Sequence, residues 1–132
     1  TVTGNNGQTE NIGSLNAPFY EPFTQERFES AKSEGKIILL EFYANWCPEC
    51  AEQKPELEQA FKEITNPKIV GFQVNFKDSE TDDFEVELAR RFGVPYQHTH
   101  VIIDSKENVL LKEIATKWNK ETAKQKLESI AG

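Results

Sequence analysis

The sequence predicts an α/β fold in which a central mixed β-sheet carries helices on both faces. Apolar stretches of strand length alternate with stretches of helical periodicity from Tyr20 onward, a pattern typical of a sheet that begins with parallel strands. The run Ile37–Tyr43 is apolar almost throughout, as expected for a strand covered on both faces. Only the polar turn at residues 105–108 separates the last two strand candidates, so these strands should pair antiparallel at one edge.

The predicted elements follow one another along the chain from Phe23. The first helix places Phe23, Phe28 and Ala31 at helical spacing, with Thr24 as its N-cap and Gly35 as its stop. The elements after it are the strand Ile37–Tyr43, a helix from Pro48 to about Ile64 that Pro55 should kink, the strand Lys68–Phe76, the helix Asp82–Phe92 with Phe84 on its apolar face, the strands Thr99–Asp104 and Val109–Ile114, and a final helix from about Lys120.

Length and composition indicate one domain behind a polar leader. The chain has 132 residues, of which 37% are hydrophobic and 28% charged. Residues 1–18 are rich in Gly, Asn, Thr and Ser and show no apolar period, so we expect a flexible leader there and a folded domain at 19–132. The chain contains no Met, even at position 1, so we expect a processed product or an excised fragment. A tether left by a removed secretion signal or lipid anchor would have this composition, which favours an extracytoplasmic location, periplasmic or membrane-tethered; a cytoplasmic location is the alternative.

Two classes of function are excluded by charge and hydropathy. The net charge is −7 and no stripe of Lys and Arg is present, so nucleic-acid binding is not expected. No apolar run approaches the roughly 18–20 residues that a membrane-spanning helix needs, so we expect no transmembrane segment in this chain. We expect a monomer.

Cys47 and Cys50 are the only cysteines and form a C-x-x-C pair where the predicted strand meets the predicted helix, a signal for redox chemistry. Unpaired amides and the positive dipole end at a helix N-terminus stabilise a thiolate. Cys47 at the cap is therefore the predicted nucleophile, and Cys50, one turn further along, the predicted resolving thiol. Pro48 suits the first helical turn, whereas the charge of Glu49 opposes thiolate formation. A purely stabilising disulfide would constrain little chain in so small a loop, and half of a zinc site is another alternative.

The stretch Glu41–Cys50, with the sequence EFYANWCPEC, resembles the strand and active-site turn of the thioredoxin family. Pro55 matches the helix-kinking proline of the family, Phe92-Gly93-Val94 and Thr99–Asp104 resemble its later loop and strand, and the resemblance extends from about Phe19 to Ile130. It is strongest to the exported and disulfide-relay branches. The resemblance implies a thioredoxin-like fold, exchange of disulfides with protein substrates through a redox-active Cys47–Cys50 pair, no cofactor or metal, and an electron donor or acceptor that the sequence does not identify.

Three positions depart from the family pattern. Glu41 stands where many thioredoxins have a buried Asp, which implies that Glu41 moves a proton to or from Cys50 through water. Gln73 stands where a Lys commonly pairs with that acid. His98 directly precedes Thr99 and so occupies the position of the family's cis-proline; the bond before it is either trans or a cis bond that costs about 2.5–4 kcal/mol. As a cation His98 would stabilise the Cys47 thiolate, and as a neutral base it could take the thiol proton.

The resemblance also implies a substrate groove formed by Trp46, Pro48, Gln97 and Thr99. It places the other histidine, His100, on the sheet and away from the cysteines, and it offers no counterpart for Trp118, which we expect to pack. Two rival functions stay open. One is a metal-handling module that binds copper or zinc through Cys47, Cys50 and His98, since thiolate and imidazole suit both ions. The other is a redox-inert binding module that keeps only the fold.

Overall fold

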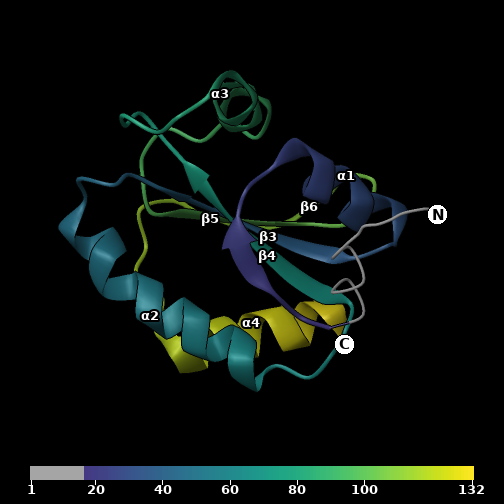
Figure 1. Cartoon of the computed structure of the whole chain (residues 1–132). Helices are drawn as coiled ribbons and strands as arrows, with labels where there is room; N and C mark the ends of the chain where they lie inside the picture. The colour runs from purple at the N-terminus through teal and green to yellow at the C-terminus, as the bar shows by residue number, and fades with distance from the viewer. Residues whose placement is uncertain (1–16) are drawn as a thin grey trace.

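A computed structural model of the chain describes residues 17–132. Residues 1–16 of the predicted leader lie outside this part of the chain. No helix within residues 17–132 is long and apolar enough to cross a membrane. The elements, shown in Figure 1, are β2 (Tyr20–Pro22), α1 (Gln25–Ser33), β3 (Ile37–Tyr43), α2 (Pro48–Glu63), β4 (Ile69–Asn75), α3 (Asp83–Arg91), β5 (Thr99–Ile103), β6 (Val109–Glu113) and α4 (Lys120–Ala131).

Within residues 17–132, five strands form one mixed sheet in the order β2-β4-β3-β5-β6. β2, β4 and β3 run parallel, whereas β5 runs antiparallel to β3 and β6 antiparallel to β5. Helices α1 and α3 cover one face of the sheet, and α2 and α4 cover the other (Figure 1). The predicted α/β class, with a mixed sheet between helices, is confirmed, and β3 lies at its centre as its continuous apolar sequence indicates.

The side chains of β3 alternate between two cores, because successive residues of a strand point to opposite faces. Ile38, Leu40 and Phe42 pack in the core beneath α1 and α3. Leu39 packs in the core beneath α2 and α4. Glu41 follows the parity of Leu39, so its carboxylate enters the sheet face that α2 covers, and this is the helix that carries Cys50.

The short strand β2 was not predicted, since the sequence indicated a helix as the first element. β2 pairs in parallel with β4 at the edge of the sheet. The amide of Gly71 donates to the carbonyl of Phe19, and the amide of Phe23 donates to the carbonyl of Gln73. Three residues are too few to show a period of two, and Pro22 is tolerated because this is an edge strand. Only the partner strand makes this segment a strand.

The buried face of α3 also differs from the prediction. Phe84 is 53% exposed, while Leu88 and Ala89 are buried as expected. The side chain of Glu85 lies on the buried face instead and accepts hydrogen bonds from the amides of Asn75 and Asp82. These bonds satisfy the carboxylate and connect the start of α3 to the end of β4. The prediction that Phe84 lies on the buried face was therefore wrong, and Glu85 is buried there instead.

Candidate active site

The two thiols lie at the N-terminus of α2. Cys47 is the N-cap residue, and its Sγ accepts a hydrogen bond of 3.2 Å from the amide of Cys50. Pro48 occupies the first helical turn, where no amide donor is needed. Both thiols are free, and both residues are buried, Cys47 at 3% and Cys50 at 5% exposure. The helix begins where the sequence indicated because a capping sulfur and a proline favour that start.

Cys50 differs from Cys47 in its surroundings. Burial, followed by a hydrogen bond to the Cys47 sulfur, raises the pKa of the Cys50 thiol to about 12. At neutral pH Cys50 therefore keeps its proton, whereas the sulfur of Cys47 sits at the helix terminus as a hydrogen-bond acceptor. The two thiols of one motif are thus chemically unequal.

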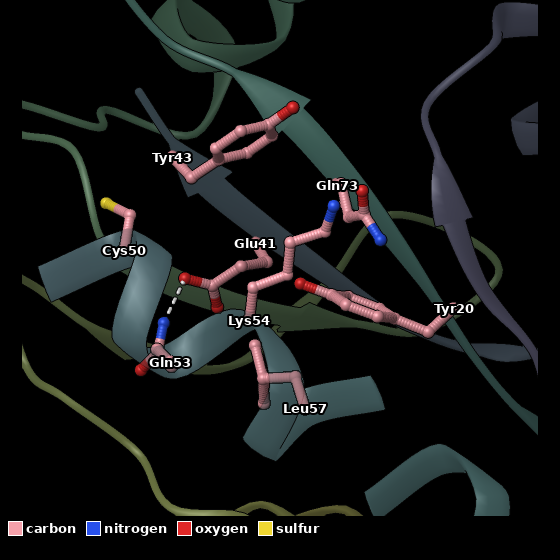
Figure 2. A pocket seen from close by; sticks show the side chains of 8 residues that line it. All are labelled: Tyr20, Glu41, Tyr43, Cys50, Gln53, Lys54, Leu57 and Gln73. Carbon is pink, nitrogen blue, oxygen red and sulfur yellow. Dashed lines mark hydrogen bonds between the residues drawn. The ribbon is translucent and has the colours of Figure 1, made fainter. Parts of the chain in front are cut away.

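Glu41 lies beside Cys50 in the interior. Both line a small cavity under the first turns of α2, together with Tyr20, Tyr43, Gln53, Lys54, Leu57 and Gln73 (Figure 2). The cavity measures about 10 Å³, which is near the lower limit for a single water. Glu41 is 2% exposed, and its Oε2 accepts a bond of 2.8 Å from Nε2 of Gln53. Glu41 and Cys50 therefore both line a space that could hold one water, and in Figure 2 the sulfur of Cys50 points away from the carboxylate.

His100 is the second partner of Glu41. The two residues oppose each other across β3 and β5. Nδ1 of His100 contacts Oε1 of Glu41, and its Nε2 contacts the carbonyl oxygen of Thr116. Because a carbonyl only accepts, Nε2 donates to Thr116, and Nδ1 faces the carboxylate of Glu41. Burial lowers the pKa of His100, but the charge and hydrogen bond of Glu41 and the Thr116 carbonyl outweigh burial and raise it overall.

His100 lies on the sheet, as expected, and it is fully buried directly behind Glu41, a contact that the sequence did not indicate. Gln73 opposes Glu41 on the other side, from β4, and is uncharged. The basic partner of Glu41 is therefore a histidine on β5, whereas many thioredoxins have a lysine at the β4 position that Gln73 occupies here.

Gln53 and Trp118 complete this cluster, and sequence reasoning assigned neither to it. The amide of Trp118 donates to Oε1 of Gln53 at 2.6 Å. The indole of Trp118 stacks on the imidazole of His100, with ring centroids 4.0 Å apart and planes 17° from parallel. Gln53 precedes Leu57 by one helical turn on the buried face of α2, and a polar residue in that position was the one signal in the sequence.

His98 enters the site from the loop before β5. Its backbone amide donates to the carbonyl of Phe42 at 2.5 Å, and its φ of 58° lies in the left-handed region. No peptide bond within residues 17–132 is cis, so the Gln97–His98 bond is trans. One ligand atom each from Cys47, Cys50 and His98 lie within 4.8 Å of one another. The structure thus brings together the three residues that the sequence singled out.

The surface around the thiols has both predicted and unpredicted members. Trp46 is 57% exposed, and its indole N–H donates to the carbonyl of Lys77. Pro48 is exposed and Gln97 half-buried. Thr99 is fully buried and its hydroxyl donates to the carbonyl of Tyr96, so this side chain orders the loop and does not face the surface. Tyr96 itself is 59% exposed, an aromatic that the sequence analysis passed over.

Comparison with known proteins places this arrangement in a family. The family model "Thioredoxin" matches residues 20–129. The chain belongs to the thioredoxin family. This finding and the C-x-x-C pair at the helix start support a thiol–disulfide oxidoreductase, as the sequence predicted.

Individual relatives match parts of the sequence. Human protein disulfide-isomerase A4 is 41% identical over 73 residues, which make up 54% of this chain and 10% of that protein. The chain therefore spans only about a tenth of that relative's length. The H-type thioredoxin of Fagopyrum esculentum is 29% identical over 94 residues, 68% of this chain and 79% of that protein.

Solved structures of thioredoxin-like proteins superpose well. Trxlp from Edwardsiella tarda matches with a TM-score of 0.66 and 25% identity, covering 82% of this chain and 97% of that one. DsbH Oxidoreductase matches with a TM-score of 0.68 and 19% identity, covering 97% and 94% of the two chains. The latter likeness concerns the fold alone.

Proposed function

We propose that the protein exchanges disulfides with protein substrates, with Cys47 as the nucleophile and Cys50 as the resolving thiol. The observation that carries this proposal is the inequality of the two thiols. Cys47 places its sulfur at the N-terminus of α2, while burial and the Cys47 sulfur raise the pKa of Cys50 to about 12, so that Cys50 keeps its proton at neutral pH. The thiolate is the attacking form, so the residue at the cap attacks first.

The exchange proceeds in two balanced steps. The Cys47 thiolate attacks one sulfur of the substrate disulfide, the substrate S–S bond breaks, and the departing sulfur leaves as a thiolate that takes up a proton. Cys50 then loses its proton and attacks the Cys47 sulfur. The mixed disulfide breaks, the second substrate sulfur leaves as a thiolate, and a Cys47–Cys50 disulfide remains. The substrate gains two electrons and the dithiol loses two, so an external electron donor must restore it; with an acceptor the same steps run in reverse.

Glu41 assists the second step by receiving the proton of Cys50. The support for this role is the cavity that both residues line and the burial of the carboxylate. A general base must lie within hydrogen-bond reach of the proton or be connected through one water. Gln53 holds the Oε2 oxygen of Glu41 at 2.8 Å, which keeps the carboxylate facing the cavity.

The substrate chain contacts the exposed surface around the thiols. Trp46 and Pro48 flank Cys47, and Tyr96 and Gln97 precede His98 on the loop that enters the site. Trp46 and Tyr96 are both more than half exposed, and exposed aromatics provide large contact areas at low entropic cost. His98 modulates the dithiol from within this loop.

Trapping of a mixed disulfide tests the assignment of roles. A Cys50→Ser variant should accumulate a covalent complex with a disulfide-containing protein, because the resolving thiol is gone. The matched Cys47→Ser variant should form none. The wild-type chain should catalyse insulin reduction by dithiothreitol. Equal trapping by both variants would contradict the assignment of separate roles to Cys47 and Cys50. A wild-type chain that does not catalyse insulin reduction would contradict the proposal of disulfide exchange.

A second measurement tests the role of Glu41. The Glu41→Gln variant keeps the shape and the capacity to hydrogen-bond, so it should slow disulfide exchange and change the pH profile of its rate. The Glu26→Gln variant is the control, since Glu26 is an exposed glutamate of α1 and lines neither the cavity nor the thiol site. An unchanged profile in Glu41→Gln would remove Glu41 from the mechanism.

For the setting of the reaction we infer an extracytoplasmic location, periplasmic or membrane-tethered, and a monomeric protein. The support is the polar composition of residues 1–18, which suits a tether. Fractionation of cells that express the gene with its natural upstream sequence tests the location, and recovery in the cytoplasm would refute it. Sedimentation velocity of the purified chain tests the monomer.

A further inference from the structure

Beyond disulfide exchange, we propose that the reduced chain binds one thiophilic metal ion, Zn²⁺ or Cu⁺, through Cys47, Cys50 and His98. The two thiols come from the first turn of α2 and the imidazole from the loop before β5. All three residues are buried. One ligand atom from each lies within 4.8 Å of the others, and together they form a single compact donor set.

The unpartnered nitrogen of His98 is an independent sign of a ligand. Nε2 of His98 is buried and has no hydrogen-bond partner among residues 17–132, and the residue is only 6% exposed. A buried polar atom without a partner is unfavourable, because it has lost its hydrogen bonds to water. The backbone of His98 also sits in the left-handed region, at φ 58°, which non-glycine residues seldom adopt. The loop therefore holds an imidazole at an unfavourable position beside two sulfurs, and a metal ion would satisfy the nitrogen.

The separation of the donors fits a metal site after a small adjustment. Zinc bonds are about 2.3 Å to sulfur and about 2.0–2.1 Å to histidine nitrogen, and the usual geometry is tetrahedral. Ligand atoms in such a site lie about 3.5–3.8 Å apart, as those bond lengths require. From the 4.8 Å limit, a sulfur and the nitrogen must approach by up to about 1.3 Å, and the two sulfurs by up to about 1 Å, to reach those separations.

The donor chemistry selects the class of ion. Thiolate ligands select Cu⁺ and Zn²⁺, and imidazole suits both metals. Two cysteines and one histidine are also the protein ligands of a known type of zinc site that keeps its fourth position for water. Binding of the ion replaces the two thiol protons, which leave to solvent, and no electron is transferred. Because a Cys47–Cys50 disulfide has no thiolate to offer, metal binding is confined to the reduced chain and competes with disulfide exchange.

Metal titration of the reduced protein tests the site. The reduced chain, with reductant removed under anaerobic conditions, is titrated with Zn²⁺ against a chromophoric chelator and with Cu⁺ against bicinchoninate. We expect one equivalent of at least one of the two ions to bind, and the titration that shows binding identifies the ion. For that ion, His98→Ala should weaken binding by at least about 100-fold, since losing a residue that only orients a metal ligand already lowers metal affinity by 10–100-fold.

Two controls keep the proposal falsifiable if His98→Ala fails to fold. The disulfide form of the wild-type chain retains His98 and should bind neither ion, and His98→Cys should retain binding because it supplies a thiolate instead. Failure of both ions to bind the reduced chain would overturn the proposal, as would equal binding by the disulfide form or by folded His98→Ala. Insulin reduction measured with a chelator present reports on disulfide exchange alone, so the two proposals can fail separately.

Discussion

The buried contact between Glu41 and His100 predicts a large effect on stability when one partner is replaced. Glu41 is 2% exposed and His100 is fully buried. Removing one member of a buried ion pair costs about 3–5 kcal/mol, because the other charge is left uncompensated. The change His100→Phe is the suitable perturbation, since a phenyl ring keeps the stacking on Trp118 while both nitrogens are lost. We therefore expect the free energy of unfolding to fall by about 3–5 kcal/mol.

The double variant Glu41→Leu with His100→Phe separates the pair from its surroundings. Replacing both members of a buried pair by apolar groups is often neutral or stabilising, so the double variant should recover most of the loss.

Urea unfolding of the four proteins at neutral pH gives the coupling energy of this cycle, which we expect to be at least about 1.5 kcal/mol. In thermal unfolding, His100→Phe should lower the Tm by about 12–20 °C, from roughly 4 °C for each kcal/mol in a domain of this size. A loss below about 1 kcal/mol in His100→Phe, or a double variant that shows the plain sum of the two single losses, would refute this reasoning.

Three further predictions concern positions away from the thiols. Hydrogen bonds from Gln59, Lys124 and Lys120 lower the pKa of Glu63 to about 2. The ionised Glu63 carboxylate therefore stabilises the fold at neutral pH, and this contribution is lost as the pH falls from about 4.5 to about 2. The urea midpoint of Glu63→Gln should be lower than that of the wild type at pH 7 and equal to it near pH 2, and a difference that does not change with pH would contradict this. In Gly71→Ala the new Cβ would meet Phe61 at 2.8 Å and Tyr20 at 2.9 Å, which should cost about 1–3 kcal/mol in urea unfolding; a neutral effect would mean that the two rings move apart freely. Asp82→Ala removes the N-cap of α3 and should lower the free energy of unfolding by about 0.5–2 kcal/mol, whereas Asp82→Asn should lower it much less because asparagine also caps helices. Equal losses in the two variants would show that the charge of Asp82, and not its capping hydrogen bond, stabilises the helix.

The parts of the fold that depend on neighbours in sequence could be predicted. Strand β3 has the bounds Ile37–Tyr43 that its apolar run indicated, and Thr24 caps α1 by accepting a hydrogen bond from Arg27. The C-x-x-C motif placed Cys47 at the cap of α2 for the same reason, because cap and proline preferences act within one helical turn. Strand β2 was missed since its pairing with β4 involves residues about fifty positions away.

The candidate site also contains residues that could be predicted from the sequence and residues that could not. Cys47, Cys50 and His98 could be singled out from sequence, because the motif fixes the two thiols and the count from Thr99 fixes the histidine. The partners of Glu41 could not. Gln53 and Trp118 read as ordinary helix and turn residues, and their contact joins positions 65 apart in the chain.

Taken by itself, the sequence determined that the protein is an α/β domain with a dithiol at a helix start, since periodicity, caps and the C-x-x-C spacing are local properties. Only the tertiary structure decided what stands behind and across from those thiols. His100 meets Glu41 because the antiparallel register of β3 and β5 places them opposite each other, 59 residues apart in the chain. A shift of that register by one residue would turn His100 to the other face of the sheet, and nothing in the local sequence of either strand states which register is adopted.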